Sequence, residues 1–165
     1  MNVFICGSSH LSPLDQKEIQ KWLSQYARKH HIHLLCYKSL EKEVLRFFVE
    51  NEHLAPNLFL YTLQPLHRLS SSFQQITEFL VEHGSTYSSF GYSHNTIYRS
   101  DYILYIKSIL ADMDLVLCFY NGDTHISVIP IDAAKEIRID AVIYDLPGTD
   151  KDLASRVLED KLRIV

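Results

Sequence analysis

The sequence predicts an α/β fold of three layers, in which helices cover both faces of a doubly wound, mostly parallel sheet of five strands. Five short runs of residues are apolar almost without interruption, which is typical of strands that are buried on both faces. Patterns with the period of a helix fall between these runs, and such alternation favours right-handed crossover connections. With 165 residues, we expect one domain over residues 1–165.

The predicted strands span residues 2–7, 32–37, 58–63, 114–120 and 140–146. The first helix should begin at Ser12, because serine is a good N-cap, Pro13 suits the first helical position and Asp15 lies three residues after the cap. Apolar stripes predict further helices near residues 40–48, 73–80, 102–110, 130–137 and 151–162. Residues 84–100 follow no clear period and are interpreted as a long loop or a short additional strand.

Charge and hydropathy limit the classes of partner. The net charge of −4 and the absence of Lys-Arg clusters predict no nucleic-acid partner. No apolar run reaches the roughly 18 residues of a membrane helix, and the first residues do not form a signal segment. We therefore expect a cytoplasmic protein with no membrane contact.

The residues that could ligate a metal do not form a recognisable site. Cys6, Cys36 and Cys118 lack the paired spacing of a zinc site, and each ends an apolar run, so small buried side chains are the favoured interpretation. The histidine-rich stretch 29–33, "KHHIH", is interpreted as a solvated turn rather than a ligand cluster. The sequence thus predicts no metal and no resident cofactor.

Ligands of open α/β sheets bind at the carboxyl ends of the strands, where the strand order reverses. This rule selects the loops at residues 7–12, 37–41, 64–72 and 121–127, with the first and fourth predicted strands flanking the crevice. Gly7 would let the backbone approach a ligand, Ser8 and Ser9 offer hydroxyl groups, and the helix that follows attracts anions. We expect the N–H groups of residues 7–9 to face an open crevice, the alternative being a purely structural turn.

Three segments carry a resemblance to a known family: "VFICGSS", "LLCYKSLEKEVLRFF" and "ILADMDLVLCFYNGDTH". Over residues 1–146 the chain resembles the SLOG superfamily, a Rossmann-like group that includes the DprA DNA-processing proteins and the LOG nucleotide hydrolases. The resemblance implies a Rossmann-like fold and a nucleotide-derived ligand. Small members typically read G-D-x-x-G-x-D-K after the second strand, whereas residues 35–42 here keep only Lys42 and an acid at Glu41.

The last binding loop also departs from the family pattern. Asn121, Gly122, Asp123, Thr124 and His125 stand where the family tends to carry a Gly-Thr pair, and the catalytic glutamate of the hydrolases has no match. Arg99 could fork onto a phosphate or carboxylate from the start of its helix. The candidate ligand-binding residues are Gly7, Ser8, Ser9, Lys38, Glu41, Arg99, Asn121, Gly122 and Thr124.

We therefore expect a module that binds a nucleotide or a nucleotide-derived small molecule without catalysis. A homodimer is one assembly compatible with this expectation. One alternative is an N-glycosidase or a nucleoside deoxyribosyltransferase-like enzyme, with Glu41 or Asp132 as the essential carboxylate. Another is a scaffold for protein interaction whose crevice has closed. The fold alone does not decide among these functions.

Overall fold

The computed structural model describes residues 1–148 and the strand backbone at 162–164. Seven strands form one sheet in the order β4-β3-β2-β1-β5-β6-β7, in which the first six are parallel and β7 pairs with β6 in the antiparallel sense. The strands are β1 (Asn2–Gly7), β2 (His31–Leu35), β3 (Leu58–Thr62), β4 (Thr86–Ser89), β5 (Leu115–Tyr120), β6 (Ala141–Asp145) and β7 (Leu162–Ile164).

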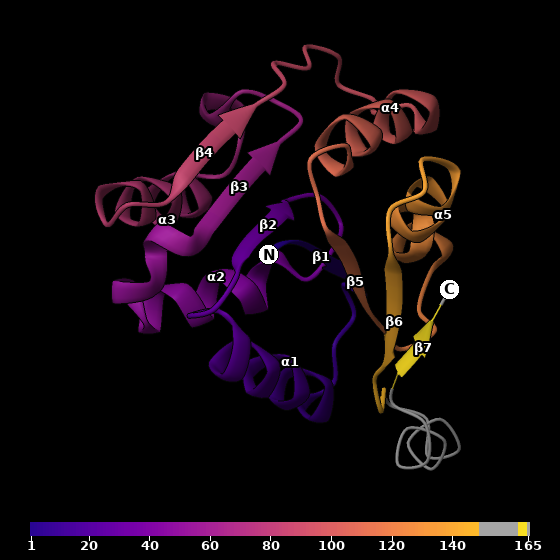
Figure 1. The fold of residues 1–165 in the computed structure, drawn as a ribbon. Coiled ribbons are helices and arrows are strands. Elements are labelled where there is room, and N and C mark those ends of the chain that lie inside the picture. Colours follow the sequence, from indigo (N-terminus) through magenta and orange to yellow (C-terminus); the bar gives the residue numbers. More distant parts are fainter. Residues whose placement is uncertain (149–161, 165) are drawn as a thin grey trace.

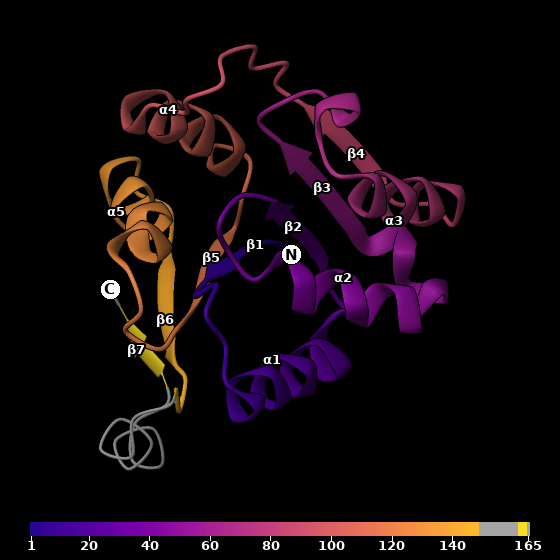
Figure 2. The ribbon, with the colours of Figure 1, turned by 180° about the vertical axis from the view of Figure 1, so that it is seen from behind.

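Helices cover both faces of this sheet, as Figures 1 and 2 show. One face carries α1 (Pro13–Tyr26), α2 (Glu41–Glu50) and α3 (Ser71–Glu82), and the other carries α4 (Arg99–Leu110) and α5 (Ile129–Glu136). Short 3-10 helices lie at Glu52–Asn57, Leu66–Arg68 and His125–Val128. The predicted three-layer α/β class is confirmed, and all five predicted strands are present within one or two residues of their expected ends.

Two additional strands raise the sheet from the predicted five strands to seven. Strand β4 lies in the segment 84–100, and its polar, mostly exposed residues at the sheet edge lack the apolar run that predicts the five inner strands. Strand β7 begins at Leu162, the last residue of the helix predicted at 151–162, so the helix prediction is wrong at that residue. The rest of that predicted helix lies outside the described residues.

The alternation of side chains along β1 explains why its residues 3–6 are all apolar. Val3 and Ile5 are buried against α1 and α2, in one core that also contains Leu23. Phe4 and Cys6 are buried in a second core under α4 and α5. Because both faces of a central parallel strand are covered, residues 3–6 of β1 are apolar, and the polar Asn2 stands at the amino end of the strand.

The first helix begins as predicted. The Ser12 hydroxyl accepts a hydrogen bond from the backbone N–H of Asp15 at 3.2 Å, and the Asp15 carboxylate accepts one from the N–H of Ser12 at 3.0 Å. This capping box satisfies two helix-end donors, and Pro13 occupies the first turn. The connection from β1 into α1 is therefore short and fixed.

The strand order reverses at β1, which pairs with β2 on one side and with β5 on the other. This confirms the expectation that the first and fourth predicted strands flank the reversal. The register sets Gly7 opposite Phe119, so that the loops after β1 and β5 leave the sheet side by side. Within the described residues, no helix is long and apolar enough to cross a membrane.

Candidate functional site

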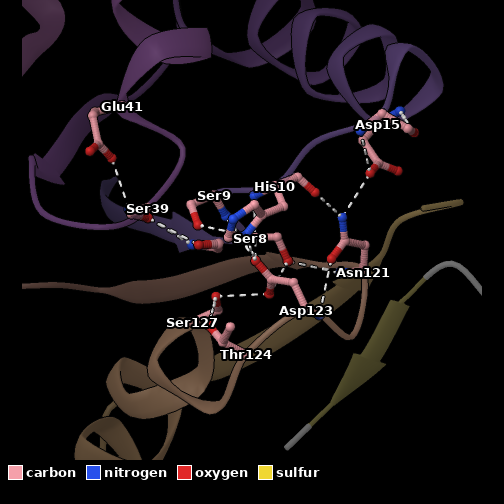
Figure 3. A network of polar contacts seen from close by, with 12 residues as sticks. Ser8, Ser9, His10, Asp15, Ser39, Glu41, Asn121, Asp123, Thr124 and Ser127 are labelled. Atoms are coloured by element: carbon pink, nitrogen blue, oxygen red, sulfur yellow. Dashed lines mark hydrogen bonds and ion pairs between the residues drawn. The ribbon is translucent and has the colours of Figure 1, made fainter. Parts of the chain in front are cut away.

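The carboxylate of Asp123 is the centre of a polar network at the strand-order reversal (Figure 3). Its Oδ1 accepts hydrogen bonds from the hydroxyl groups of Ser8 at 2.9 Å and Ser127 at 3.0 Å. Its Oδ2 accepts from the backbone N–H groups of Ser9 at 3.1 Å and His10 at 3.4 Å. Asp123 thus takes the position that an anionic ligand would occupy above the β1 loop.

The environment of Asp123 keeps it ionised. Burial alone would raise the pKa of this carboxyl, but hydrogen bonds from the N–H of Thr124, from Ser8, from Ser127 and from His10 outweigh it and hold the pKa below the usual 3.8. A fixed negative charge therefore lies at the floor of the site at neutral pH.

Asn121 holds the loops after β1 and β5 together. Its backbone N–H donates to the Ser8 hydroxyl at 3.0 Å, and its side-chain oxygen accepts from the N–H of Asp123 at 3.1 Å. Its amide nitrogen donates to the carbonyl of His10 at 2.7 Å and to the Asp15 carboxylate at 2.9 Å. Asn121 therefore has little hydrogen-bonding capacity left for a ligand.

The same network reaches the end of β6 through Asp15, which is fully buried. The second carboxylate oxygen of Asp15 accepts from the N–H of Gly148 at 2.6 Å. A residue that caps α1 thereby joins the loops that follow β1, β5 and β6. Its burial is explained by these partners, because an unpaired carboxylate at this depth would be costly.

The loop after β2 contacts β1 through Ser39. The N–H of Gly7 donates to the Ser39 hydroxyl at 3.0 Å, and that hydroxyl approaches the carbonyl of Gly7 at 3.3 Å. The N–H of Ser39 donates to the Glu41 carboxylate at 2.9 Å. Burial raises the pKa of Glu41 above 4.5, although the N–H groups of Glu41 and Ser39 and the charge of Lys42 act in the opposite direction.

The prediction that the N–H groups of residues 7–9 face an open crevice is wrong. They donate instead to the Ser39 hydroxyl, to the carbonyl of Phe119 and to Asp123, and Ser8 is fully buried. The absence of a side chain at Gly7 serves packing, since a Cβ there would lie 2.1 Å from the Phe119 carbonyl oxygen and 2.9 Å from Leu40 Cδ2. Gly7 thus makes room for a neighbouring strand and for the start of α2.

The remaining candidate residues form an exposed rim. Lys38 has a left-handed backbone (φ 44°), and its ammonium group lies 5.4 Å from the centre of the Tyr37 ring. Gly122 has φ 85° with open space around it, and Thr124 is exposed. Arg99, also exposed at the start of α4, makes no hydrogen bond or ion pair with any described residue.

The structure therefore divides the predicted residues into two groups. Ser8, Ser9 and Asn121 meet at Asp123, and Gly7 meets Glu41 through Ser39. Lys38, Arg99 and Gly122 lie outside this network. Thr124 belongs to it, because its N–H donates to Asp123 and its hydroxyl is 3.5 Å from that of Ser127. Asp132, the alternative carboxylate, faces His125 at 3.9 Å on an exposed part of α5.

The sequence analysis did not identify the residues that organise the network, namely Ser39, Asp123 and Ser127. It identified Asp15 as a helix cap but not as the acceptor for Asn121 and Gly148. One signal was present, because Asp123 stands in a loop after an apolar strand, opposite a loop rich in N–H and hydroxyl donors. The described residues contain no cluster of three or more histidine, cysteine or acidic side chains suited to a metal ion. Cys6 and Cys118 are buried, as predicted, and Cys36 is partly buried.

Fold and site together define a Rossmann-like α/β protein with a polar strand-order reversal. The chain is similar to the structure of DNA processing protein A from Helicobacter pylori, described for its single-stranded DNA binding mode. The TM-score is 0.61 at 12% identity, covering 96% of this chain and 72% of that one. The sequence matches no family model and no curated protein.

This similarity corrects one expectation. The net charge of the chain predicts no nucleic-acid partner, but a protein of this fold binds single-stranded DNA. Net charge is a poor guide to this class of partner, because nucleic-acid binding depends on the local distribution of cations rather than on the net charge. The exclusion of nucleic acid is therefore wrong.

Proposed function

We propose that the chain binds a nucleotide, either free or as a unit of a single-stranded nucleic acid, over the loops at the strand-order reversal. The network around Asp123 is the observation that carries this proposal. A hydrogen-bonded set of polar groups fills the floor of the reversal, where apolar side chains would fill a closed scaffold. Ligands of open α/β sheets bind at this position.

The charges suggest how the ligand would be oriented. The ionised Asp123 repels phosphate from the floor, so sugar hydroxyl or base amino groups should face it. The phosphate would then lie at the rim near Lys38 and Arg99. These two cations flank a pair of aromatic rings. The rings of Tyr37 and Tyr102 have centroids 5.5 Å apart. Tyr37 precedes Lys38 in the chain, and Tyr102 lies about one turn after Arg99 on α4.

The similarity to a single-stranded DNA-binding protein supports the nucleic-acid form of the ligand. The resemblance to the SLOG superfamily supports the free nucleotide, and membership of that superfamily stays a prediction. Both ligands share a phosphate linked to a nucleoside, and one experiment distinguishes them.

The test compares short fluorescently labelled single-stranded oligonucleotides, followed by anisotropy, with a panel of mononucleotides followed by calorimetry. Replacing Lys38 and Arg99 together by alanine should weaken binding by roughly tenfold or more and reduce its salt dependence. The matched control replaces Arg28 and Lys29, which are exposed at the far end of α1, by alanine. Absence of binding in both arms, or equal losses in test and control variants, would overturn the proposal in favour of an interaction scaffold.

Glu41 favours a second candidate function, hydrolysis of an N-glycosidic bond. Its raised pKa and its position after β2 suit a carboxylate that activates water near a ribose. The Glu41 carboxylate would take a proton from water as the water oxygen bonds to the anomeric carbon. The carbon–nitrogen bond to the nucleobase would break, and that proton would then pass to the departing nucleobase. Release of free base from a nucleotide panel, abolished in Glu41→Gln, would support this candidate, whereas absence of release by the wild-type chain would eliminate it.

A further inference from the structure

A cavity of about 300 Å³ lies between the sheet and the last turn of α4, on the face opposite α1. Its walls come from the middle of β2 and β3, from the amino end of β1 and from the turn after α4. It is therefore distinct from the loops at the carboxyl ends of the strands. Its volume is at the lower end of the range for small-molecule sites, which suits a ligand the size of one or two rings.

One wall of this cavity is aromatic and electrically neutral. The ring of His33 stacks on that of Phe59 with centroids 4.4 Å apart and planes at 16°, and it lies 5.9 Å from the ring of Tyr61. Phe90 also lines the cavity. Flat rings bind to such walls by offset stacking.

The hydrogen bonds of His33 fix its neutral form. Its Nε2 lies 3.0 Å from the side-chain oxygen of Asn2, an acceptor, so Nε2 carries the proton. Its Nδ1 then accepts from the Tyr61 hydroxyl at 2.9 Å. Burial, followed by the charge of His31, lowers the pKa of His33 to about 4, against the opposing effect of Asp112. His33 is thus neutral at pH 7 and does not pair with Asp112.

Two polar groups that line the cavity are left without partners among the described residues. The exposed Asp112 carboxylate forms no hydrogen bond or ion pair there, although it is close enough to act on His33 and Tyr61. The side-chain nitrogen of Asn2 likewise has no partner, because Asn2 engages through its backbone N–H and its side-chain oxygen. The cavity therefore offers one charged acceptor and one neutral donor beside an aromatic wall.

We propose that this cavity is a second ligand site, which takes a planar heterocycle bearing an amino group, as nucleobases do. The ring stacks on the Phe59 wall, and its amino group donates to the Asp112 carboxylate, as an aspartate accepts from the amino group of cytosine. A ring nitrogen or carbonyl oxygen of the ligand accepts from the side-chain nitrogen of Asn2. This site does not depend on the function proposed for the carboxyl edge.

Nucleosides test this site without engaging the rim cations, because they carry no phosphate. Cytidine against uridine and guanosine against inosine are pairs that differ in an amino group, and calorimetry with amide chemical shifts measures affinity and location. We expect cytidine and guanosine to bind more tightly than their partners and to shift the amides of Ser108, Asp112 and Met113. Equal affinities within both pairs would overturn the proposal.

Variants locate the interaction. Asp112→Asn should weaken binding of the amino-bearing nucleosides by roughly tenfold or more, since a charge-assisted hydrogen bond is lost. The matched control is Asp140→Asn, an exposed aspartate before β6, which should bind as the wild type does. Absence of saturable nucleoside binding, or unchanged binding by Asp112→Asn, would refute this second site and leave the carboxyl-edge proposal standing.

Discussion

The hydroxyl group of Ser8 donates a hydrogen bond of 2.9 Å to the carboxylate of Asp123, and this contact joins the loops after β1 and β5. The same carboxylate accepts from the backbone N–H groups of Ser9 and His10. An internal anion thus satisfies donors that an external anion would otherwise use. The site is organised before any ligand arrives, and its floor is negative.

Replacing Asp123 by alanine should destabilise the fold. The buried hydroxyl of Ser8 and the N–H groups of Ser9 and His10 would lose their acceptor, which costs about 1–3 kcal/mol of unfolding free energy. Urea unfolding measures the change. Asp132→Ala, which removes an exposed carboxylate 3.9 Å from His125, should stay within about 0.5 kcal/mol of the wild type. Equal losses in both variants would show that the network contributes no special stability.

Acidification should expose the contribution of Asp123 to stability. Its folded pKa is below the ordinary 3.8, so the unfolded chain takes up the proton first as the pH falls. The stabilisation is complete above that ordinary value and is lost as the pH drops through the folded pKa. Unfolding free energies measured from about pH 5 to about pH 2 should therefore fall more steeply in the wild type than in Asp123→Asn. Parallel curves would contradict the assignment.

Gly7→Ala should damage the fold far more than Gly122→Ala. At Gly7 the added Cβ would lie 2.1 Å from a backbone carbonyl oxygen, at φ 154°, so strand β5 or the loop would have to move. At Gly122 the added Cβ would meet open space, and only the positive φ of 85° is unfavourable, at about 1 kcal/mol. Thermal melts of both variants test the difference. A mild effect at Gly7 would mean that the chain relaxes easily at the reversal.

His33 should titrate with a pKa of about 4, because burial disfavours its charged form. Proton NMR of the imidazole measures this value directly. Tyr61→Phe removes the hydroxyl that donates to Nδ1 and stabilises the neutral ring, so the pKa of His33 should rise in that variant. Since the folded pKa is below the ordinary 6.5, stability should fall as the pH drops from 6.5 toward 4. An ordinary pKa in the wild type would contradict the observed burial.

Glu41→Gln should remove a pH dependence of the opposite sign. The folded pKa of Glu41 is raised above 4.5, so its contribution to stability is present at lower pH and declines as the pH rises through the folded value. The glutamine side chain keeps an oxygen for the N–H of Ser39 without the buried charge. The variant should therefore gain stability relative to the wild type as the pH increases above 4.5. A relative loss over that range would show that the ionised Glu41 is favoured in the folded state.

Local patterns in the sequence predict the class of the fold and most of its elements, with β4 and β7 as the exceptions. The uninterrupted apolar run at β1 reflects burial on both faces, and the cap of α1 is formed within the four residues 12–15. These signals are local, so they can be interpreted without knowing which segments are neighbours. The order of β1 and β5 also followed, because few crossover topologies are compatible with alternating strands and helices.

The chemistry of the two sites depends on contacts between segments that are distant in the sequence. Ser8 and Asp123 are 115 residues apart in the sequence, and only the β1–β5 pairing brings them into contact, which turned an expected open anion site into a filled one. His33 lies in a stretch that we interpreted as a solvated turn, yet it is buried in β2 between Phe59 and Tyr61. Whether a polar residue contacts a ligand, caps a helix or lines a cavity depends on its neighbours in space. The free energy of those long-range contacts is not encoded in any local sequence pattern.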